Sequence, residues 1–326
     1  MIWIAGIGAY VPPRVVTNDD IIAHSALKMR GAWIEKVIGI RERRWVDPGT
    51  AASDLAAGAI RELGLRDFRG SLFLSTVSPD YLTPSTASVV KRKLEDRSHF
   101  PAVDVAAACA GHLFALQLAQ HRLAATGERE ALVVASEVRS VFLNPSDRRT
   151  VFLFGDGACA LHVRNDEDAP GSLEWLHTAS APSDTIEIHV PAGGSAHPMS
   201  EEAMTRGLQF ISMNDGPKIL KLTSDWLVNE IQQVLCQHNT SASDFDFFVF
   251  HQGNAIIGKT LCEALGVPPA KTHSNFERFG NTSSASLGIA LAEAAELRRI
   301  KKGDRVLLVA MGAGYHLGIA SVVWGL

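Results

Sequence analysis

Short apolar runs alternate along the chain with longer segments whose apolar residues recur at helical spacing. Apolar runs that end in polar or glycine-containing turns are typical of strands buried in a sheet. Such strands are predicted at 2–11, 71–76, 102–107, 131–137, 159–163, 245–250, 306–311 and 319–324. Helices are predicted at 84–94, 108–125, 217–237, 254–265 and 284–299. This alternation predicts an α/β fold in which helices cover the faces of largely parallel sheets.

The plan of the first half recurs in the second half. Each half closes with two apolar runs separated by glycines, FGDGACALHV at Phe154–Val163 and MGAGYHLGIASVV at Met311–Val323. This weak similarity predicts two related halves, 1–165 and 208–326. The segment 166–207 between them is rich in Pro, Ser and Gly, so an irregular linker is predicted there. A plain surface loop is the favoured interpretation of this linker, and a lid over an active site is the alternative.

Composition and charge narrow the class of protein. The 326 residues are 46% hydrophobic and 20% charged, which is ordinary for a globular protein. No apolar run approaches the roughly 20 residues that span a bilayer, and the first ten residues are expected to be a strand rather than a signal peptide. A formal net charge of −4 argues against nucleic acid or an anionic membrane as the main partner. We therefore expect a cytoplasmic protein.

The four cysteines are widely spaced and form no CxxC pair, so neither a metal site nor a disulfide framework is expected. Cys159, Cys236 and Cys262 are predicted to lie in the core. Cys109 differs, because it follows a strand and several small residues and precedes an apolar helix. The positive end of a helix stabilises a thiolate, which makes Cys109 a candidate nucleophile. From the spacing alone, a buried structural cysteine is the safer interpretation.

Three polar segments of the second half are candidates for a site. His251 directly follows an apolar strand, where ligands gather in parallel sheets, although a structural histidine is equally compatible. The segment FGNTSSAS at Phe279–Ser286 is either a helix-capping turn or a turn from which the amide of Asn281 points into a site as a hydrogen-bond donor. The loop from Gly312 to Gly314 lies between two strands and can present backbone N–H groups to an oxyanion.

Taken together, these segments resemble one family. AACAG around Cys109, HQGN from His251, GNTSSAS and the last Gly-rich loop follow the order and distances of FabH-type β-ketoacyl-ACP synthase III, of the thiolase superfamily. Three further segments resemble the same family and extend the likeness over nearly the whole chain: GIGAYVPPRVVTNDDI at Gly6–Ile21, WIEKVIGIRERRW at Trp33–Trp45 and DRRTVFLFGDGACA at Asp147–Ala160. The resemblance implies a five-layered αβαβα fold of two pseudo-duplicated halves, usually assembled as a homodimer.

The resemblance also implies roles for site residues. Cys109 would be acylated by an acyl-CoA primer. His251 and Asn281 would donate hydrogen bonds to the thioester carbonyl of a malonyl extender and stabilise the enolate that remains when CO2 departs. The backbone N–H groups of Cys109 and Ala313 would hold the acyl oxyanion, and Phe154 would lie beside the thiol. This chemistry is consistent with the residue types, since a thioester calls for a soft nucleophile and an enolate for hydrogen-bond donors.

Substrate binding is less well matched to the family. Trp33 and Arg148 fall where relatives stack the adenine of coenzyme A, and an acyl carrier protein would deliver the extender. Val37 and Ile256 stand where the family often has arginine, which predicts a weakened docking surface for coenzyme A and the carrier. The following cations are candidates for replacement contacts: Arg41, Arg43, Arg44, Lys218, Lys221 and Lys259.

The leading function is therefore a decarboxylative condensation that yields a 3-oxoacyl thioester, coenzyme A and CO2. The alternative is an acyltransferase that moves the acyl group to a hydroxyl or amine without condensation; Asn281 argues for condensation. Chemistry like that of hydroxymethylglutaryl-CoA synthase ranks lower, because the loop Asp80–Ser88 offers Asp80 and no glutamate as a base. A non-catalytic subunit is disfavoured, because both Cys109 and His251 are present. The acyl primer stays open.

Overall fold

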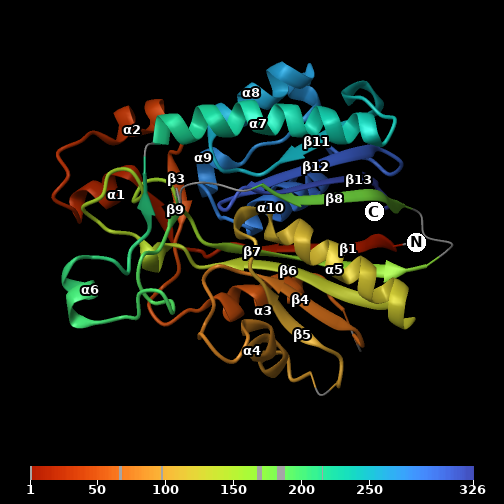
Figure 1. Ribbon diagram of the computed structural model, residues 1–326, viewed down its shortest axis with the longest axis horizontal. Helices are drawn as coiled ribbons and strands as arrows, with labels where there is room; N and C mark the ends of the chain where they lie inside the picture. Colours follow the sequence, from red (N-terminus) through yellow and green to blue (C-terminus); the bar gives the residue numbers. More distant parts are fainter. Residues whose placement is uncertain (1, 66–67, 97, 167–170, 182–187, 215) are drawn as a thin grey trace.

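The computed structural model describes residues 2–326 except 66–67, 97, 167–170, 182–187 and 215, and gives only the backbone of 216–223. Two sheets form its frame (Figure 1). The first has the order β1-β7-β6-β4-β5, and the second has the order β11-β12-β13-β8. The strands of the first sheet are β1 (Ile2–Tyr10), β4 (Ser71–Ser75), β5 (Ala102–Val105), β6 (Glu130–Glu137) and β7 (Gly157–Asn165). The strands of the second are β8 (Ser172–Ser180), β11 (Phe247–Phe250), β12 (Arg305–Gly312) and β13 (His316–Val323).

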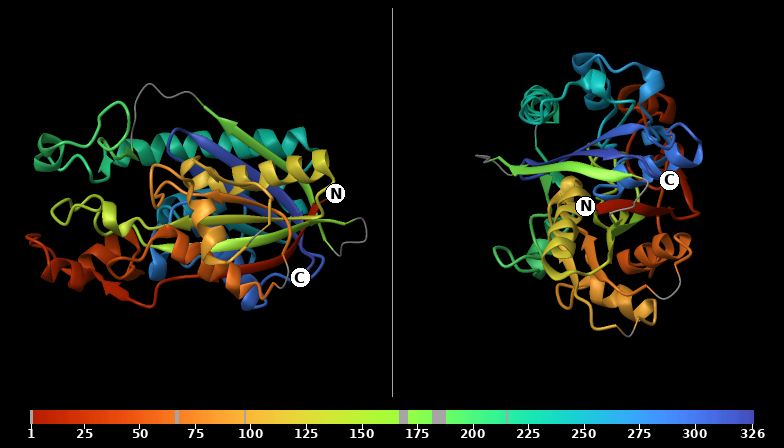
Figure 2. Two further views of the ribbon diagram at one scale, coloured as in Figure 1. Left: turned by 90° about the horizontal axis from the view of Figure 1, so that it is seen from below. Right: turned by 90° about the vertical axis from the view of Figure 1, so that its right-hand side faces the viewer.

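Helices separate the two sheets and cover their outer faces, which gives the predicted five layers (Figures 1 and 2). In β4, alternate residues point to opposite faces. Leu72 and Leu74 therefore pack in the outer cluster with α3 (Ala52–Glu62) and α4 (Thr86–Lys93), while Phe73 packs in the central cluster. On the far side, α7 (Gly216–Gln237) and α8 (Ala255–Leu265) cover the second sheet.

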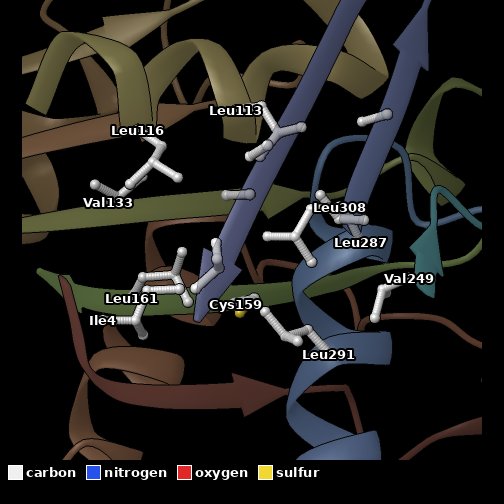
Figure 3. Packing of buried hydrophobic residues seen from close by; sticks show 14 of the residues in the cluster. Ile4, Leu113, Leu116, Val133, Cys159, Leu161, Val249, Leu287, Leu291 and Leu308 are labelled. Carbon is white, nitrogen blue, oxygen red and sulfur yellow. The ribbon is translucent and has the colours of Figure 1, made fainter. Parts of the chain in front are cut away.

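The central layer consists of α5 (Gly111–Thr126) and α10 (Ala285–Glu296). Leu113 and Leu116 of α5 and Leu287 and Leu291 of α10 pack among apolar residues of both sheets (Figure 3). Each helix is sandwiched between two sheets, so it is apolar on nearly every side rather than along one stripe. The central layer fixes the start of α5 and of α10 in one buried region.

Smaller elements surround this frame. The strands β2 (Val15–Thr17) and β3 (Glu42–Arg44) form one ribbon, and β9 (Ile188–His189) and β10 (Ser212–Met213) form another. The short helices are α1 (Asn18–Ala23), α2 (Gly31–Ile38), α6 (Glu201–Thr205) and α9 (Phe276–Phe279). The 3-10 turns are η1 (Ala108–Ala110), η2 (Ser140–Phe142), η3 (Ala242–Asp244) and η4 (Pro269–Lys271).

The segment 166–207 is not wholly irregular, as the composition had suggested. Residues 172–180 form β8, which pairs antiparallel with β13 and so completes the second sheet. In the second sheet, β8 holds the position that β1 holds in the first, and the strand directions also match: antiparallel, antiparallel, then parallel. The topological repeat therefore begins at β8, before residue 208. Polar residues in β8 concealed it, because an edge strand need not be apolar.

All the strands predicted from the sequence are present, with ends shifted by a few residues. The periodicity missed α3, because its buried face is mostly alanine and carries little apolar signal. Of the cysteines predicted as core, Cys159 is buried, Cys262 is half-buried and Cys236 is exposed on α7, so the prediction for Cys236 is wrong. Every helix in the described part of the chain is too short or too polar to cross a membrane.

Candidate active site

Cys109 lies in the turn that joins β5 to α5. Ala108 has a φ of 44°, in the left-handed region, and this sharp turn places Cys109 at the N-terminal end of the buried helix. The last residue of β12, Gly312, lies against the same turn. A Cβ atom at Gly312 would stand 2.7 Å from the backbone nitrogen of Cys109 and 2.9 Å from the carbonyl oxygen of Ala107. Only glycine fits there, and the loop that follows it carries Ala313.

The Cys109 thiol is neutral in the free protein. Burial raises its pKa to about 11; the hydrogen bond to Ser283 lowers the pKa, and the charge of Glu137 raises it further. The sequence had suggested a thiolate stabilised by the helix terminus. That expectation is wrong for the free protein, because loss of solvation outweighs the partial charge of one helix end.

His251 directly follows β11, and its backbone N–H donates to Val309. Its Nδ1 lies 2.5 Å from the Ser286 hydroxyl, whose oxygen also accepts the backbone N–H of Gln252 at 3.2 Å. We therefore assign the hydroxyl proton to the bond with Nδ1, which leaves the imidazole proton on Nε2. Burial lowers the pKa of His251 to about 4. The ring is thus a neutral donor through Nε2–H.

Asn281 precedes α10 and is buried. Its backbone N–H donates to Leu153 at 2.9 Å, and its carbonyl accepts from Gly155 at 3.1 Å, so it is bridged to Phe154 in the loop before β7. Its side-chain Oδ1 accepts the N–H of Ser283 at 2.8 Å. Because the oxygen is held in this bond, the amide can offer a ligand its Nδ2 donors. Phe154 is also buried, beside Asn281.

One loop, 281–286, joins all three candidates. Ser283 Oγ accepts a hydrogen bond from Cys109 Sγ across 3.6 Å, and its own N–H holds Asn281. Ser286, at the start of α10, holds His251. The structure thus connects a thiol, an imidazole donor and an amide that lie up to 172 positions apart in sequence. A thiol nucleophile next to two neutral donors is suited to acyl transfer and to stabilising an enolate.

Glu137 is a site residue that the sequence reasoning missed. It ends β6, is fully buried, and accepts four hydrogen bonds. Val77 N–H and Ser78 Oγ donate to Oε2 at 3.2 and 2.9 Å, and the hydroxyls of Ser283 and Ser284 donate to Oε1 at 3.2 and 2.6 Å. The glutamate near the site therefore lies at the end of β6, and the loop Asp80–Ser88, where no glutamate was found, is not the place of it. A charged residue at the carboxyl end of the apolar strand ALVVASE was the available signal.

Asp80, which the sequence offered as a possible base, has a structural place. Its carboxylate accepts the backbone N–H and the hydroxyl of Ser53, at 3.0 and 2.5 Å, and holds the start of α3.

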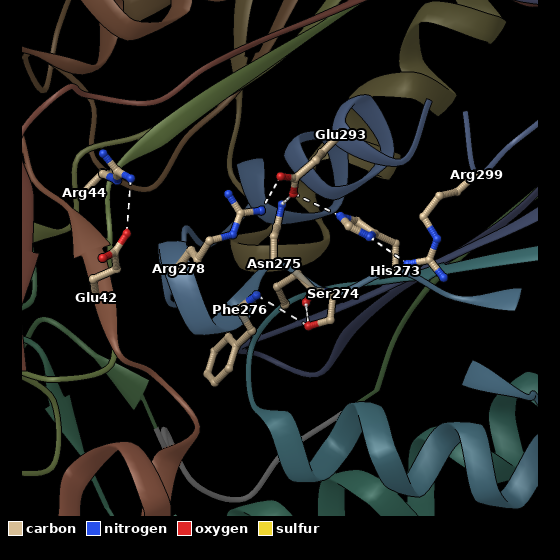
Figure 4. A network of polar contacts seen from close by, with 10 residues as sticks. Glu42, Arg44, His273, Ser274, Asn275, Phe276, Arg278, Glu293 and Arg299 are labelled. Carbon is tan, nitrogen blue, oxygen red and sulfur yellow. Dashed lines mark hydrogen bonds and ion pairs between the residues drawn. The ribbon is translucent and has the colours of Figure 1, made fainter. Parts of the chain in front are cut away.

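A polar network anchors the segment before Asn281 to α10 (Figure 4). Glu293 of α10 accepts hydrogen bonds from Asn275 at 2.9 Å and His273 at 3.0 Å, and it forms an ion pair with Arg278. These bonds hold the pKa of Glu293 at about 2, although burial opposes them. Arg299 contacts the other ring nitrogen of His273 at 3.0 Å. The network fixes α9 against α10 and so fixes the loop between them.

The comparisons with known proteins agree with this geometry. The family descriptions 3-Oxoacyl-[acyl-carrier-protein (ACP)] synthase III and 3-Oxoacyl-[acyl-carrier-protein (ACP)] synthase III C terminal match residues 103–180 and 235–324. A β-ketoacyl-[acyl-carrier-protein] synthase III of Syntrophomonas wolfei is 36% identical over 99% of this chain and 98% of its own. The chain belongs to the β-ketoacyl-ACP synthase III family.

Two other relatives extend the picture of this condensing enzyme. The crystal structure of the synthase III from Thermus thermophilus superimposes with a TM-score of 0.86, at 31% identity and 99% coverage of both chains. It supports the thiolase-like fold. An acetoacetyl CoA synthase of Streptomyces sp. strain CL190 is 34% identical over 98% of this chain and 98% of its own. The acyltransferase class of the enzyme and its place in the ketosynthase family follow from these relatives.

The residues predicted to bind coenzyme A lie on the surface of the enzyme. Trp33, on α2, is 55% exposed, and Arg148 is exposed in the turn 147–150. Val37 on α2 and Ile256 on α8 are also about half exposed, and the two helices meet where the ideal Cβ position of Gly39 lies 3.1 Å from Ala255 Cβ. Two apolar side chains are therefore exposed near the contact of α2 with α8, at the positions where the family resemblance would place arginine.

Of the candidate replacement cations whose side chains the structure describes, one is buried. Arg43 is fully buried and donates to Asn18 and to the Phe152 carbonyl, each at 2.7 Å, so its prediction as a docking residue is wrong. Arg41 is exposed and paired with Glu277 at 2.7 Å. Lys218 and Lys221 lie outside the described side chains. In the described residues, no group of three or more His, Cys, Asp or Glu side chains is placed to hold a metal ion.

Proposed function

We propose that this condensing enzyme transfers an acyl group from an acyl-CoA to Cys109 and then joins it to a malonyl thioester with loss of CO2. The observation that supports these roles is the loop 281–286, which contacts Cys109, His251 and Asn281 through Ser283 and Ser286. In the first half-reaction Sγ attacks the acyl carbon and coenzyme A leaves. The backbone N–H groups of Cys109 and Ala313 stabilise the oxyanion.

The second half-reaction uses the two neutral donors. Decarboxylation leaves an enolate on the extender, with negative charge on the thioester oxygen. His251 Nε2–H and Asn281 Nδ2–H donate to that oxygen. Asn281 is buried and His251 is half-buried, and a hydrogen bond to a charged oxygen is strong where water is largely excluded. Neither group needs to change its protonation state. Phe154, beside Asn281, keeps water from the departing carboxylate.

The decisive test separates the two half-reactions. Asn281→Asp keeps the shape but replaces the donor by an acceptor-only carboxylate facing the enolate. Loss of one such donor typically costs about 2.7 to 4 kcal/mol, a factor of about 100 to 1,000. The variant should form acyl-Cys109 at a near-normal rate, measured by intact mass, yet release almost no labelled CO2 from malonyl thioester. If both rates fall together, Asn281 supports the fold and the assigned role is wrong.

Asn144→Asp is the matched control. Asn144 Oδ1 accepts the Ser146 N–H at 2.9 Å, a bond that an aspartate oxygen makes equally well. Both rates should stay within about twofold of the wild type, because surface changes of this kind usually cost under about 0.5 kcal/mol. Wild-type enzyme that forms acyl-Cys109 but never releases CO2 would restore the alternative function, acyl transfer to a hydroxyl or amine.

The delivery of the extender is a separate part of the proposal. Val37 and Ile256 are exposed and uncharged, so neither offers a cation to an acidic carrier protein, and a similar protein is named an acetoacetyl CoA synthase. We therefore expect malonyl-CoA to serve as well as malonyl-carrier protein. The double variant Val37→Arg, Ile256→Arg should raise kcat/KM for malonyl-carrier protein and leave acylation of Cys109 by a pantetheine thioester, which lacks the phosphates of coenzyme A, unchanged. A strong wild-type preference for the carrier would contradict this expectation.

Coenzyme A binding and assembly complete the proposal. Trp33 and Arg148 flank the adenine of the acyl-CoA primer. Both side chains are exposed and so can contact it. The enzyme is a homodimer, as the family resemblance implies, and light scattering during size-exclusion chromatography tests this directly.

A further inference from the structure

The Cys109 thiol must lose its proton before it attacks a thioester, and the structure restricts where that proton goes. Burial raises the pKa of the thiol to about 11, so little thiolate is present at neutral pH. His251 is a poor acceptor, since its Nδ1 is occupied by Ser286 and its Nε2 already carries a proton. This imidazole is suited to donating to the extender, not to accepting from the thiol.

Another path leads away from the thiol. Cys109 Sγ–H donates to Ser283 Oγ across 3.6 Å, and Ser283 Oγ–H donates to Glu137 Oε1 across 3.2 Å. Both hydrogen bonds run in the same direction, from thiol to hydroxyl to carboxylate. Glu137 is fully buried and Ser283 is 2% exposed, so this path is shielded from bulk water. The carboxylate is held in place by Val77 and Ser78 on its other oxygen.

We propose that Glu137 is the proton acceptor for Cys109 during acylation and that Ser283 carries the proton between them. This inference deepens the proposed function and rests on Cys109 being the acylated residue. As the bond from Sγ to the acyl carbon forms, the thiol proton passes to Ser283 Oγ and the Ser283 proton passes to Glu137. The tetrahedral oxyanion then collapses and the bond to the sulfur of coenzyme A breaks. The proton returns from Glu137 to Ser283 Oγ, and Ser283 passes its own proton directly to the departing coenzyme A thiolate.

Electrostatics favours this path over loss of the proton to water. If the thiol released its proton to solvent, two anions, Sγ and Glu137, would remain in one site with only the Ser283 hydroxyl between them. Like charges this close repel each other where water is largely excluded. Transfer to Glu137 moves the single negative charge onto sulfur, so the number of buried charges stays constant. The same carboxylate that disfavours the resting thiolate thereby ceases to oppose it at the moment of attack.

The chain offers a matched pair of variants. Ser283 and Ser284 both donate to Glu137 Oε1, but only Ser283 contacts Cys109. Ser283→Ala breaks the path, whereas Ser284→Ala removes a hydrogen bond to the same oxygen and leaves the path intact. General base catalysis typically contributes a factor of about 100 or more. We expect Ser283→Ala to slow acylation by acetyl-CoA about 100-fold at pH 7, and Ser284→Ala to slow it less than about threefold.

The pH profile distinguishes a proton path from a structural role. As the pH approaches 11, hydroxide removes the thiol proton directly, so the defect of Ser283→Ala should shrink steadily with rising pH. A defect that is the same at every pH, or an equal defect in Ser284→Ala, would overturn the proposal. Ser283 has a φ of 52°, which glycine adopts without strain. Ser283→Gly therefore secures a folded variant without the hydroxyl, and it should show the same loss.

Glu137→Gln distinguishes two roles of Glu137, because they predict opposite changes in the rate of acylation. If Glu137 acts only through its charge, removing that charge should lower the pKa of the thiol and speed acylation at pH 7. If Glu137 accepts the proton, acylation should slow. Acylation is followed by intact mass without any extender, so this result is independent of decarboxylation. Wild-type enzyme that is never acylated would refute the proposed function itself, whereas normal acylation of Ser283→Ala would refute only the proton path.

Discussion

The two central helices begin in the same way and carry different chemistry. Ala108, with a φ of 44°, directly precedes Cys109 at the start of α5, and Ser283, with a φ of 52°, directly precedes Ser284 at the start of α10. By this match Cys109 and Ser284 occupy equivalent places in the two halves. One turn presents a thiol, and the other presents hydroxyls next to the Asn281 amide. The duplicated fold has thus separated nucleophile from donors.

Each of these turns is contacted by a strand that belongs to the other half. Glu137 ends β6 in the first sheet and binds Ser283 and Ser284 at the start of α10. Gly312 ends β12, the matching strand of the second sheet, and lies against the turn of Cys109. Each helix start therefore rests on a strand of the other half. The site exists only where both halves meet, so neither half contains it alone.

The largest expected effect comes from making the two turns alike. Cys109→Ser places in the first turn the residue that Ser284 supplies in the second. A serine hydroxyl ionises far less readily than a thiol, so acylation by acyl-CoA should fall at least about a thousandfold, or roughly 4 kcal/mol in the barrier. Intact mass after incubation with acetyl-CoA measures this. Full acylation of the variant would identify another residue as the nucleophile.

The contact between the halves is tested at Gly312. Gly312→Ala puts a methyl group 2.7 Å from the Cys109 nitrogen, so the turn must shift, and a displacement near 1 Å costs about 100-fold in rate. Acylation should therefore fall about 100-fold. Gly258→Ala is the control, since no atom lies within 4 Å of the added carbon and the helix tolerates alanine. Equal rates for the two variants would show that Gly312 does not position Cys109.

Trp33 tests whether the first half also binds the primer. Trp33→Ala should weaken the binding of acetyl-CoA by about 1 to 3 kcal/mol, the usual contribution of a base stacked on an aromatic ring. A pantetheine thioester, which lacks adenine, should lose much less. KM for acylation by the two substrates measures the difference. An equal loss for both substrates would mean that the indole supports α2 and does not bind adenine.

The smallest effect is expected in the anchor of the second turn. Glu293→Gln weakens the hydrogen bonds and ion pair of the network and should lower the free energy of unfolding by about 1 kcal/mol near neutral pH. The folded pKa of about 2 lies below the unfolded value of 4.5, so this stability is present above pH 4.5 and is lost as the pH falls toward 2.

Urea unfolding of the wild type and Glu293→Gln at several pH values measures this difference. It should disappear near pH 2. Glu296→Gln, at the exposed end of α10, is the control and should match the wild type throughout. A difference between wild type and Glu293→Gln that persists undiminished at pH 2 would show that the charge of Glu293 is not its cause.

The sequence by itself determined the α/β class and the candidate residues of this protein. Apolar runs of strand length that alternate with helical segments require sheets covered by helices, because apolar surfaces are unfavourable in water. The five layers followed from the family resemblance alone. The order of the segments around Cys109, His251 and Asn281 was enough to suggest the family. The edge strand β8 and the alanine-rich helix α3 escaped the pattern, because their burial depends on what packs against them.

Only the tertiary structure decided the electrostatics of the site and the partners of each group. A pKa depends on solvation and on charges that can belong to distant parts of the chain. Burial and the charge of Glu137 therefore raise the pKa of the Cys109 thiol, although the thiol lies at a helix terminus. The proton on His251 Nε2 follows from Ser286, 35 positions away. The contact of Ser283 with Cys109 joins residues 174 positions apart, and no local pattern specifies such a pair.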